Sequence, residues 1–346
     1  EIEQAVLTTF FHSQPAPQKA HLRALKLAVA PTSPDRIELE KGLRRWAQES
    51  YWLDDKYSST EGGALPEEWR LGNKPNLTQI HREKKRAVEA DPGLIAVRLD
   101  KAVRDVKKLT EGASALGVRV HHLPEKPSDI EDDGQFHFAV LGPEAGSESG
   151  KPSPMAKRFL EETTGPAKPR VYRNAVILAV PSKDGLEIVR SRIADLLAWE
   201  QVESELQDQA KSGSVDAQRR QRLTVEMEKA RKLVPDAIRQ AWSMIVTVSE
   251  SNEAQAFKLN ITDDPLFTTL KADPRARLQE TKITAESLLP GGPYDLWKEG
   301  ETLRRVKDLA GAFAQLPHLP KMLNASAIVD TLVDGCAAGD FVLQLK

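Results

Sequence analysis

Apolar residues recur at helical spacing through the first part of the chain. Short apolar segments at residues 51–53 and 68–71, with a Gly-Gly pair between them, predict a two-stranded wing. Asn76 predicts the N-cap of a further helix over 77–90. These patterns together predict a winged-helix-like domain over residues 1–90. The stripes that predict its first three helices are Ile2, Val6 and Phe10; Leu22, Leu25 and Val29; and Leu39, Leu43 and Trp46.

The pattern then changes to alternating strands and helices over residues 91–182, which we predict to form a small α/β domain. The apolar run at 175–180 is unbroken, as in a strand covered on both faces. Residues 170–174 are expected to lead into it as part of the same strand. The other elements predicted here are a helix over 94–111, strands over 118–123 and 136–141, an exposed loop over 143–153 and a helix over 154–163.

Long helices are predicted for residues 183–255, which continue the α/β domain as a helical hairpin. The first helix ends near the break at 211–214, and the second begins near Val215. The charges between 203 and 232 alternate in sign, which is typical of solvated helix faces. Pro235 is expected in the first turn of a third helix. The face of that third helix would carry Ile238, Trp242, Ile245 and Val246.

The last segment, residues 256–346, is predicted to form a second winged-helix-like domain. Its predicted elements are a strand over 257–261, short helices over 265–271 and 276–281, helices capped by Thr302 and Asn324, and a strand over 341–345. The expected fold class is therefore mixed α/β and helix-rich. Winged-helix-like units at both ends flank a small α/β layer and a long helical hairpin.

Composition narrows the classes of function. The 346 residues include 49 Lys+Arg and 51 Asp+Glu, and a formal net charge of −2 argues against a protein that coats nucleic acid over its whole surface. A single cysteine excludes an intramolecular disulfide and a cysteine-rich zinc site. No apolar run reaches membrane-spanning length and no secretory segment is visible, so we expect a cytoplasmic protein that contacts no membrane. Because the chain begins at Glu1 and its first methionine is Met155, we expect it to be part of a longer protein.

Several catalytic and metal motifs fail on inspection. Residues 146–151 approach a phosphate-binding P-loop, but Ala145 replaces the first glycine and Pro152 replaces the magnesium-binding hydroxyl. His121 and His122 point to opposite faces of a strand, so they cannot both reach one metal ion. Cys336 is expected to be a small buried thiol. We therefore assign no catalytic residue and no metal ligand.

Basic residues form the first group of candidate contacts. Their pattern predicts either a phosphate-contacting surface for nucleic acid or a structural and protein-docking role. The third predicted helix mixes its cations with glutamates, which is unfavourable for attracting phosphate. The residues in question are Lys41, Arg44, Arg45, Arg82, Lys84, Lys85, Arg86, Lys101, Arg104 and Lys108. Within this set, Lys101, Arg104 and Lys108 share one face of the helix predicted over 94–111.

Arg170, Arg173 and Asn174 form the second group, at the entrance to the buried strand. On a strand, Arg170 and Asn174 would face one way and Arg173 the other. An arginine at a strand end can bind a phosphate or a carboxylate with two hydrogen bonds. The alternative is that these residues form ion pairs at an interface between domains.

Several of these segments, in this order, resemble the C-terminal half of a known family. The segments are Trp69-Arg70-Leu71, Pro75-Asn76-Leu77, Arg170-Val171-Tyr172-Arg173-Asn174, Ile177-Leu178-Ala179-Val180-Pro181, Leu197-Ala198-Trp199, Leu316-Pro317-His318-Leu319-Pro320 and Asp334-Gly335-Cys336-Ala337-Ala338-Gly339. The family consists of large AAA+ ATPases of unknown function from prokaryotic defence islands, akin to the ATPases of Pgl/BREX-type phage-exclusion systems. The resemblance spans nearly the whole chain.

The resemblance implies that the ATPase residues, with their ATP and magnesium, lie upstream, and that this segment carries no cofactor. The chain would be a non-catalytic accessory region that relays ATP-driven motion or docks partners in phage defence. Such partners would be the upstream ATPase domain, methyltransferase or helicase subunits, or DNA. Arg170, Arg173 or Asn174 could then sense nucleotide. Two alternatives stay open: a DNA-binding winged-helix module of a restriction-like complex, and an independent enzyme that uses the 170–174 strand end.

Overall fold

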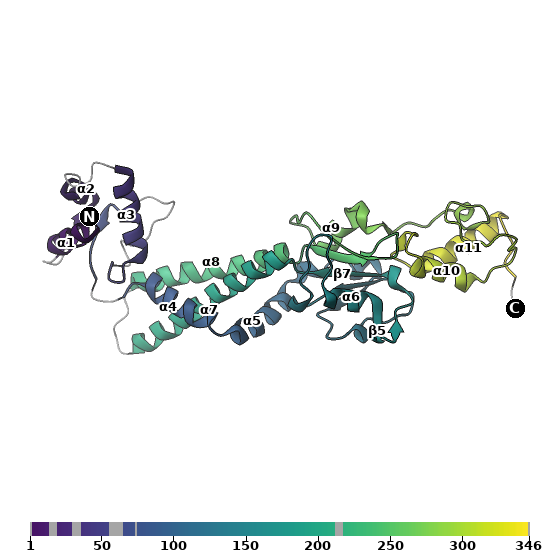
Figure 1. The fold of residues 1–346 in the computed structure, drawn as a ribbon, viewed down its shortest axis with the longest axis horizontal. Helices are drawn as coiled ribbons and strands as arrows, with labels where there is room; N and C mark the ends of the chain where they lie inside the picture. Colours follow the sequence, from purple (N-terminus) through teal and green to yellow (C-terminus); the bar gives the residue numbers. More distant parts are fainter. Residues whose placement is uncertain are drawn as a thin grey trace. The chain divides into compact units, whose positions relative to one another are not determined.

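The computed structural model describes residues 2–13, 19–29, 36–54, 65–72, 75–211 and 217–344. The chain divides into two compact units. The first unit comprises Glu1–Val97 with Ser191–Val234, and the second comprises Arg98–Arg190 with Pro235–Lys346. The expectation of a mixed α/β, helix-rich fold is confirmed (Figure 1).

The N-terminal part of the first unit is a small helical cluster closed by a short sheet. The strand at 68–71 is confirmed in part, because β2 pairs antiparallel with β1. The strand predicted at 51–53 is reduced to a single antiparallel bridge between Leu53 and Leu71. The core of this N-terminal cluster includes Trp46 and Trp69, whose rings stack with centroids 4.8 Å apart. The elements are α1 (Ile2–Ser13), β1 (Ala20–His21), α2 (Leu22–Val29), α3 (Arg36–Glu49) and β2 (Glu68–Trp69). The Gly62-Gly63 turn lies outside the described residues.

Longer helices complete the first unit. The predicted N-cap is confirmed, because the Asn76 side chain accepts a hydrogen bond from the amide of Gln79. The imidazole of His81 stacks on Trp199 at 4.0 Å and contacts the backbone carbonyl of Asp195. The helices are α4 (Leu77–Glu89), α5 (Pro92–Asp105), α7 (Lys183–Lys211) and α8 (Ala217–Ala241), and the chain passes between the units within the last three of these.

The second unit is built on a sheet of five strands, in the order β3-β4-β7-β8-β9. The first three strands are parallel, and β8 and β9 continue the sheet antiparallel. Every residue of β7 is buried, which confirms the covered strand expected from the unbroken apolar run. Helix α6 (Pro154–Glu161) packs Phe159 and Leu160 against the sheet. The strands are β3 (Arg119–His122), β4 (His137–Val140), β7 (Val176–Val180), β8 (Met244–Val248) and β9 (Ala254–Lys258).

Two predictions in this region are wrong. Pro235 begins no third helix, because α8 continues through it to Ala241 and is followed by β8. Of the residues predicted on its face, Ile238 belongs to α8, whereas Ile245 and Val246 lie on the buried strand β8, because a short apolar run matches helical spacing as well. The helix predicted over 94–111 ends at Asp105, and a 3-10 turn, Lys107–Leu109, follows.

The segment at 170–174 is not a strand. It follows β6 (Lys168–Pro169), which pairs with β5 (Glu162–Gly165), and its last two residues belong to a 3-10 turn at Arg173–Ala175 that enters β7. The alternation of side chains predicted for this segment is therefore wrong, since it requires extended backbone throughout.

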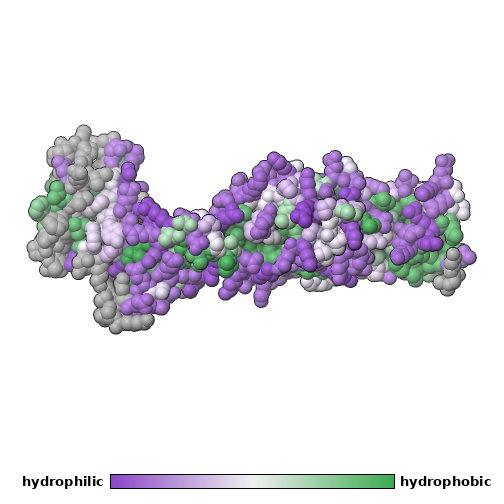
Figure 2. Space-filling model, turned by 60° about the horizontal axis from the view of Figure 1, so that its bottom comes forward, coloured by the Kyte–Doolittle hydropathy of each residue, from purple (hydrophilic) through white to green (hydrophobic). Residues whose placement is uncertain are grey.

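The C-terminal elements have their own apolar core, which includes Leu309, Phe313 and Leu332. Strands β10 and β11 are parallel, and α10 lies beside α11 (Figure 1). The helix predicted over 276–281 is replaced by a turn and β10, and residues 341–344 form no strand. The elements are α9 (Leu266–Ala272), β10 (Leu278–Gln279), α10 (Val306–Gln315), β11 (Lys321–Met322) and α11 (Ser326–Ala338). Figure 2 shows apolar surface over these elements, where Leu303, Val329, Val333 and Val342 are exposed.

Candidate functional site

The segment that follows β6 sends its three polar side chains to three different parts of the second unit. The 3-10 turn at Arg173–Ala175 rotates the backbone, so these side chains do not share a face. Arg170 points into the loop before β4, Arg173 reaches the turn between β8 and β9, and Asn174 points toward β11. The residues that the sequence singled out are close in sequence but do not converge on one ligand-sized space.

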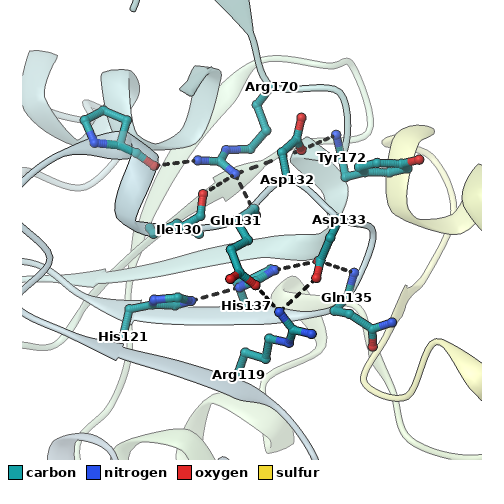
Figure 3. A network of polar contacts seen from close by, with 11 residues as sticks. Arg119, His121, Ile130, Glu131, Asp132, Asp133, Gln135, His137, Arg170 and Tyr172 are labelled. Atoms are coloured by element: carbon teal, nitrogen blue, oxygen red, sulfur yellow. Dashed lines mark hydrogen bonds and ion pairs between the residues drawn. The ribbon is translucent and has the colours of Figure 1, made fainter. Parts of the chain in front are cut away.

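Arg170 is a buried clamp on the loop that precedes β4 (Figure 3). Its side chain is inaccessible, and its guanidinium donates to the carbonyls of Pro127, Ile130, Glu131 and Glu162 at 3.0–3.2 Å. The nearest carboxylate oxygen belongs to Asp132, at 3.9 Å, and that carboxylate accepts hydrogen bonds from the amides of Val171 and Tyr172. Burial lowers the pKa of Arg170, and Asp132 partly opposes this effect. These contacts occupy both terminal nitrogens of the guanidinium.

Asn174 joins the sheet to the C-terminal elements. Its amide nitrogen donates to the carbonyls of Phe313 and Leu319 at 2.8 and 3.1 Å. Its side-chain oxygen accepts a hydrogen bond of 2.5 Å from the amine of Lys321, a residue with no exposed surface. Burial holds the pKa of Lys321 well below its ordinary value, and the nearby cation of Arg277 lowers it further. Among the described residues, no carboxylate pairs with this amine.

Arg173 makes the most accessible of the three contacts. Its guanidinium donates to the side-chain oxygen of Asn252 at 2.8 Å. Asn252 lies in the turn between β8 and β9 and has a positive φ of 67°, a conformation that asparagine tolerates better than most residues. The contact therefore fixes this turn against the entrance to β7.

A chain of titratable groups lies on β3 and β4, next to the Arg170 clamp (Figure 3). His137 donates through Nε2 to Asp133 at 3.0 Å, and its Nδ1 lies 2.9 Å from Nε2 of His121. Asp133 also accepts from the amide of Gln135 and pairs with Arg119 at 2.9 Å. If Nε2 of His137 carries the proton toward Asp133, its Nδ1 must accept the proton of His121.

The parallel register explains why these groups meet. Arg119 of β3 lies opposite His137 of β4, and His121 is two residues farther along the same face. Burial lowers the pKa of both His121 and His137, and Asp133 partly opposes this for His137. Burial also acts to raise the pKa of Asp133, but hydrogen bonds from Gln135 and His137 outweigh it, so the net shift is downward. The arrangement is a hydrogen-bonded chain of two imidazoles that ends at a carboxylate.

The basic residues predicted to contact nucleic acid are mostly paired with acceptors. Lys84 pairs with Glu205 at 3.0 Å and Lys85 with Asp195 at 3.4 Å, both in the first unit. Lys108 lies beyond the end of α5, so it does not share a helical face with Lys101 and Arg104. Further ion pairs join Lys41 to Glu38, Arg45 to Glu49 and Arg104 to Asp100, and Lys108 donates to the carbonyl of Asp263. Arg82 also has an interaction partner. The side chains of Arg44, Arg86 and Lys101 are exposed.

Sequence reasoning missed Lys321 and Arg277. Lys321 follows Pro320 in a segment with no periodic pattern, and its partner Asn174 is 147 residues away. Arg277 has a positive φ of 52° and donates to the carbonyls of Val248 and Pro317. A local pattern carries no signal for such contacts, because each depends on which distant segments the fold brings together.

Two further properties concern only the described parts of the chain. No group of three or more potential metal-binding side chains gathers there. None of the helices in these parts combines the length and apolar character needed to cross a membrane.

Comparisons with known proteins found no relatives. No protein-family model, no curated protein and no solved structure matches the chain. The resemblance to defence-island ATPases therefore stays a prediction from the sequence.

Proposed function

We propose that the chain is a non-catalytic accessory region of a multidomain AAA+-type ATPase, which relays ATP-driven motion or docks partners. The observation that carries the proposal is the set of contacts made by residues 170–174, which are the most specific part of the resemblance. Its polar side chains hold together the sheet, the turn after β8 and the C-terminal elements. Side chains used in this way support a rigid body that transmits force.

The geometry favours an interface or structural role over nucleotide sensing for the same residues. An arginine finger must bring free donors to a phosphate, whereas both terminal nitrogens of Arg170 are bound to carbonyls. Arg173 is the member of the segment whose contact is most easily exchanged, because its partner is the exposed Asn252. Substitution of Arg173 therefore distinguishes nucleotide sensing from an interface or structural role.

We also propose that residues 1–72 form a winged-helix unit. Supporting this, the order helix, strand, helix, helix, strand and the pairing of β1 with β2 match that topology. The bridge between Leu53 and Leu71 lies where the base of a wing would be. For the C-terminal elements, the parallel pairing of β10 with β11 gives less support, since a wing is an antiparallel hairpin.

The test is ATP turnover by the longer protein that carries the residues encoded upstream of Glu1. Arg173→Ala is expected to leave turnover within a factor of about two, since removal of a nucleotide-contacting arginine costs roughly 10³-fold or more. Arg190→Ala serves as the matched control, because Arg190 is an exposed arginine paired with Glu187. Arg170→Ala is expected to reduce the folded fraction, and the turnover of each variant is normalised to that fraction.

Two outcomes would overturn the proposal. A loss of roughly 10³-fold in turnover for folded Arg173→Ala would make this segment part of the catalytic machinery. An upstream sequence without a phosphate-binding loop would mean that the longer protein is not an AAA+-type ATPase.

A further inference from the structure

A groove of about 570 Å³, lined mainly by residues of polar and charged types, opens beside the turn between β8 and β9. Its volume lies within the range of roughly 300–1,000 Å³ that is usual for small-molecule sites, although the groove is wide open to solvent. One wall comes from the turn and β9, and the other from the 3-10 turn at Pro274–Ala276 and the residue after it. The lining consists of Ser249, Glu250, Ser251, Gln255, Pro274, Arg275 and Arg277.

Arg277 brings a largely buried cation to this groove. Its guanidinium donates to the carbonyls of Val248, Pro317 and Leu319, all of which are neutral. Nη2 makes only one of these three bonds, so one of its N–H groups remains for a ligand, whereas all four terminal N–H groups of Arg170 are bound to carbonyls. The nearest carboxylate is that of Glu250, at 4.0 Å, and this side chain is mostly exposed. The left-handed backbone of Arg277 is unfavourable for a residue that carries a Cβ, so glycine would be favoured on conformational grounds alone.

The buried Lys321 is bonded to the backbone of Arg277, and burial favours its neutral form, so the positive charge near the groove comes from Arg277. The backbone carbonyl of Arg277 accepts a hydrogen bond from the amide of Lys321, whose amine is fully buried. Among the described residues, neither group has a buried carboxylate beside it. Positive charge in a region of low dielectric acts strongly on an anion at the groove.

Arg275 is held in place at the rim. Its guanidinium lies 4.6 Å from the ring centroid of Phe257, and it donates to both carboxylate oxygens of Asp273 and to the carbonyl of Lys258. About half of the side chain stays exposed. The hydroxyls of Ser249 and Ser251 lie 2.8 Å apart and are further donors within the lining.

We propose that this groove binds a phosphorylated small molecule, with its phosphate group between Arg275 and Arg277. A phosphate carries close to two charges and presents several acceptor oxygens, which match guanidinium and hydroxyl donors. The groove is larger than a phosphate alone, so the rest of the ligand occupies the part lined by Gln255 and Pro274. This inference is independent of the function proposed above, because it concerns binding by the 346-residue chain itself.

The test is isothermal titration of the 346-residue chain with inorganic phosphate, ADP and acetate. Saturable binding of phosphate or ADP is expected, with acetate at least about tenfold weaker because it has one charge. Arg275→Gln is expected to weaken binding about tenfold, the usual effect of losing a hydrogen bond to a charged group. Tighter binding of ADP than of phosphate would identify a nucleoside phosphate as the ligand, and equal binding would identify the phosphate group alone as the recognised part.

Glu250→Gln is a variant that should change the affinity for phosphate in the opposite direction to Arg275→Gln. Removing the carboxylate from the groove is expected to strengthen phosphate binding several-fold, whereas Arg190→Gln, outside the groove, is expected to have no effect. Arg277→Gln is measured only after its thermal unfolding has been checked, because Arg277 also holds three carbonyls. The proposal fails if neither phosphate nor ADP binds, if acetate binds as well as phosphate, or if Arg275→Gln and Glu250→Gln leave the affinities unchanged.

Discussion

Cationic side chains inside the second unit are satisfied mainly by neutral oxygens. Arg170 is surrounded by four carbonyls, and Lys321 contacts the side chain and backbone of Asn174. A buried charge without a charged partner is costly, so the protonation state of such a group responds to burial. The stability of the second unit should therefore depend on pH through a few identifiable residues.

Lys321→Met is expected to remove a stabilisation that appears at alkaline pH. The unfolded lysine titrates near 10.5, and burial places the pKa of the folded residue well below that value. Between the two values the unfolded state binds more protons, so the free energy of unfolding rises with pH by up to about 1.4 kcal/mol per pH unit. Urea unfolding at several alkaline pH values should show this rise in the wild type and a flatter profile in Lys321→Met. Lys282→Met is the control. The hydrogen-bonded ion pair with Asp334 raises the pKa of Lys282, so this residue lowers the free energy of unfolding as the pH rises, the opposite of Lys321.

His137→Gln is expected to reduce the loss of stability on mild acidification. The unfolded histidine titrates near 6.5, and burial lowers the pKa of the folded residue. As the pH falls below about 6.5 the unfolded state gains a proton first, so the free energy of unfolding decreases by up to about 1.4 kcal/mol per pH unit. The contribution of Asp133, whose pKa is also lowered, is lost only at lower pH. Unfolding of wild type, His137→Gln and the exposed-site control His318→Gln between pH 7 and pH 5 checks this, and identical slopes would contradict it.

At the scale of elements, the sequence was informative where a local pattern sets the structure. The Asn76 cap and the buried strand β7 were predicted because a capping residue and an unbroken apolar run act locally. Ile245 and Val246 were assigned to a helix because a short apolar run fits either period, and only the neighbouring strands decide between them. The clamp at Arg170 was predicted as a polar cluster, but its partners depend on the tertiary fold.

Two glycines in helices test the packing of these elements. A Cβ added at Gly185 would lie 2.5 Å from Oγ of Ser182 and 2.7 Å from Cα of Ala241. Gly185→Ala is therefore expected to destabilise the protein by about 1–3 kcal/mol despite its better helix propensity. At Gly311 the nearest atoms lie at 3.8 and 3.9 Å, and Gly311→Ala is expected to stabilise by up to about 1 kcal/mol. Thermal unfolding of both variants checks the pair, and a stabilised Gly185→Ala would show that the two helices separate more easily than this packing implies.

On the scale of the whole molecule, charge is balanced locally as well as overall. The formal net charge of −2 arises from 49 basic and 51 acidic residues. The cations of α4 face carboxylates of α7 in the first unit, so positive charge does not accumulate there. This balance favours protein docking over the DNA-binding alternative.

Duplex DNA binding by the 346-residue chain is accordingly expected to be weak and to disappear by about 0.2 M salt. Fluorescence anisotropy of a labelled duplex over a salt series measures it. Lys84→Gln and Arg44→Gln, a paired and an exposed cation, are expected to change the affinity by less than about twofold. Tight binding that survives 0.2 M salt and falls with Arg44→Gln would contradict this expectation and favour the DNA-binding alternative.

The contact between Asn174 and Lys321 also bears on how the chain folds. Closing a loop of 147 residues costs about 4 kcal/mol of chain entropy, which must be met before the contact itself stabilises anything. During synthesis, the sheet strands through β9 leave the ribosome before Lys321 exists. The amide of Asn174 therefore stays hydrated until the segment that carries Lys321 has been synthesised, and the C-terminal elements dock after the strands of the sheet have been made.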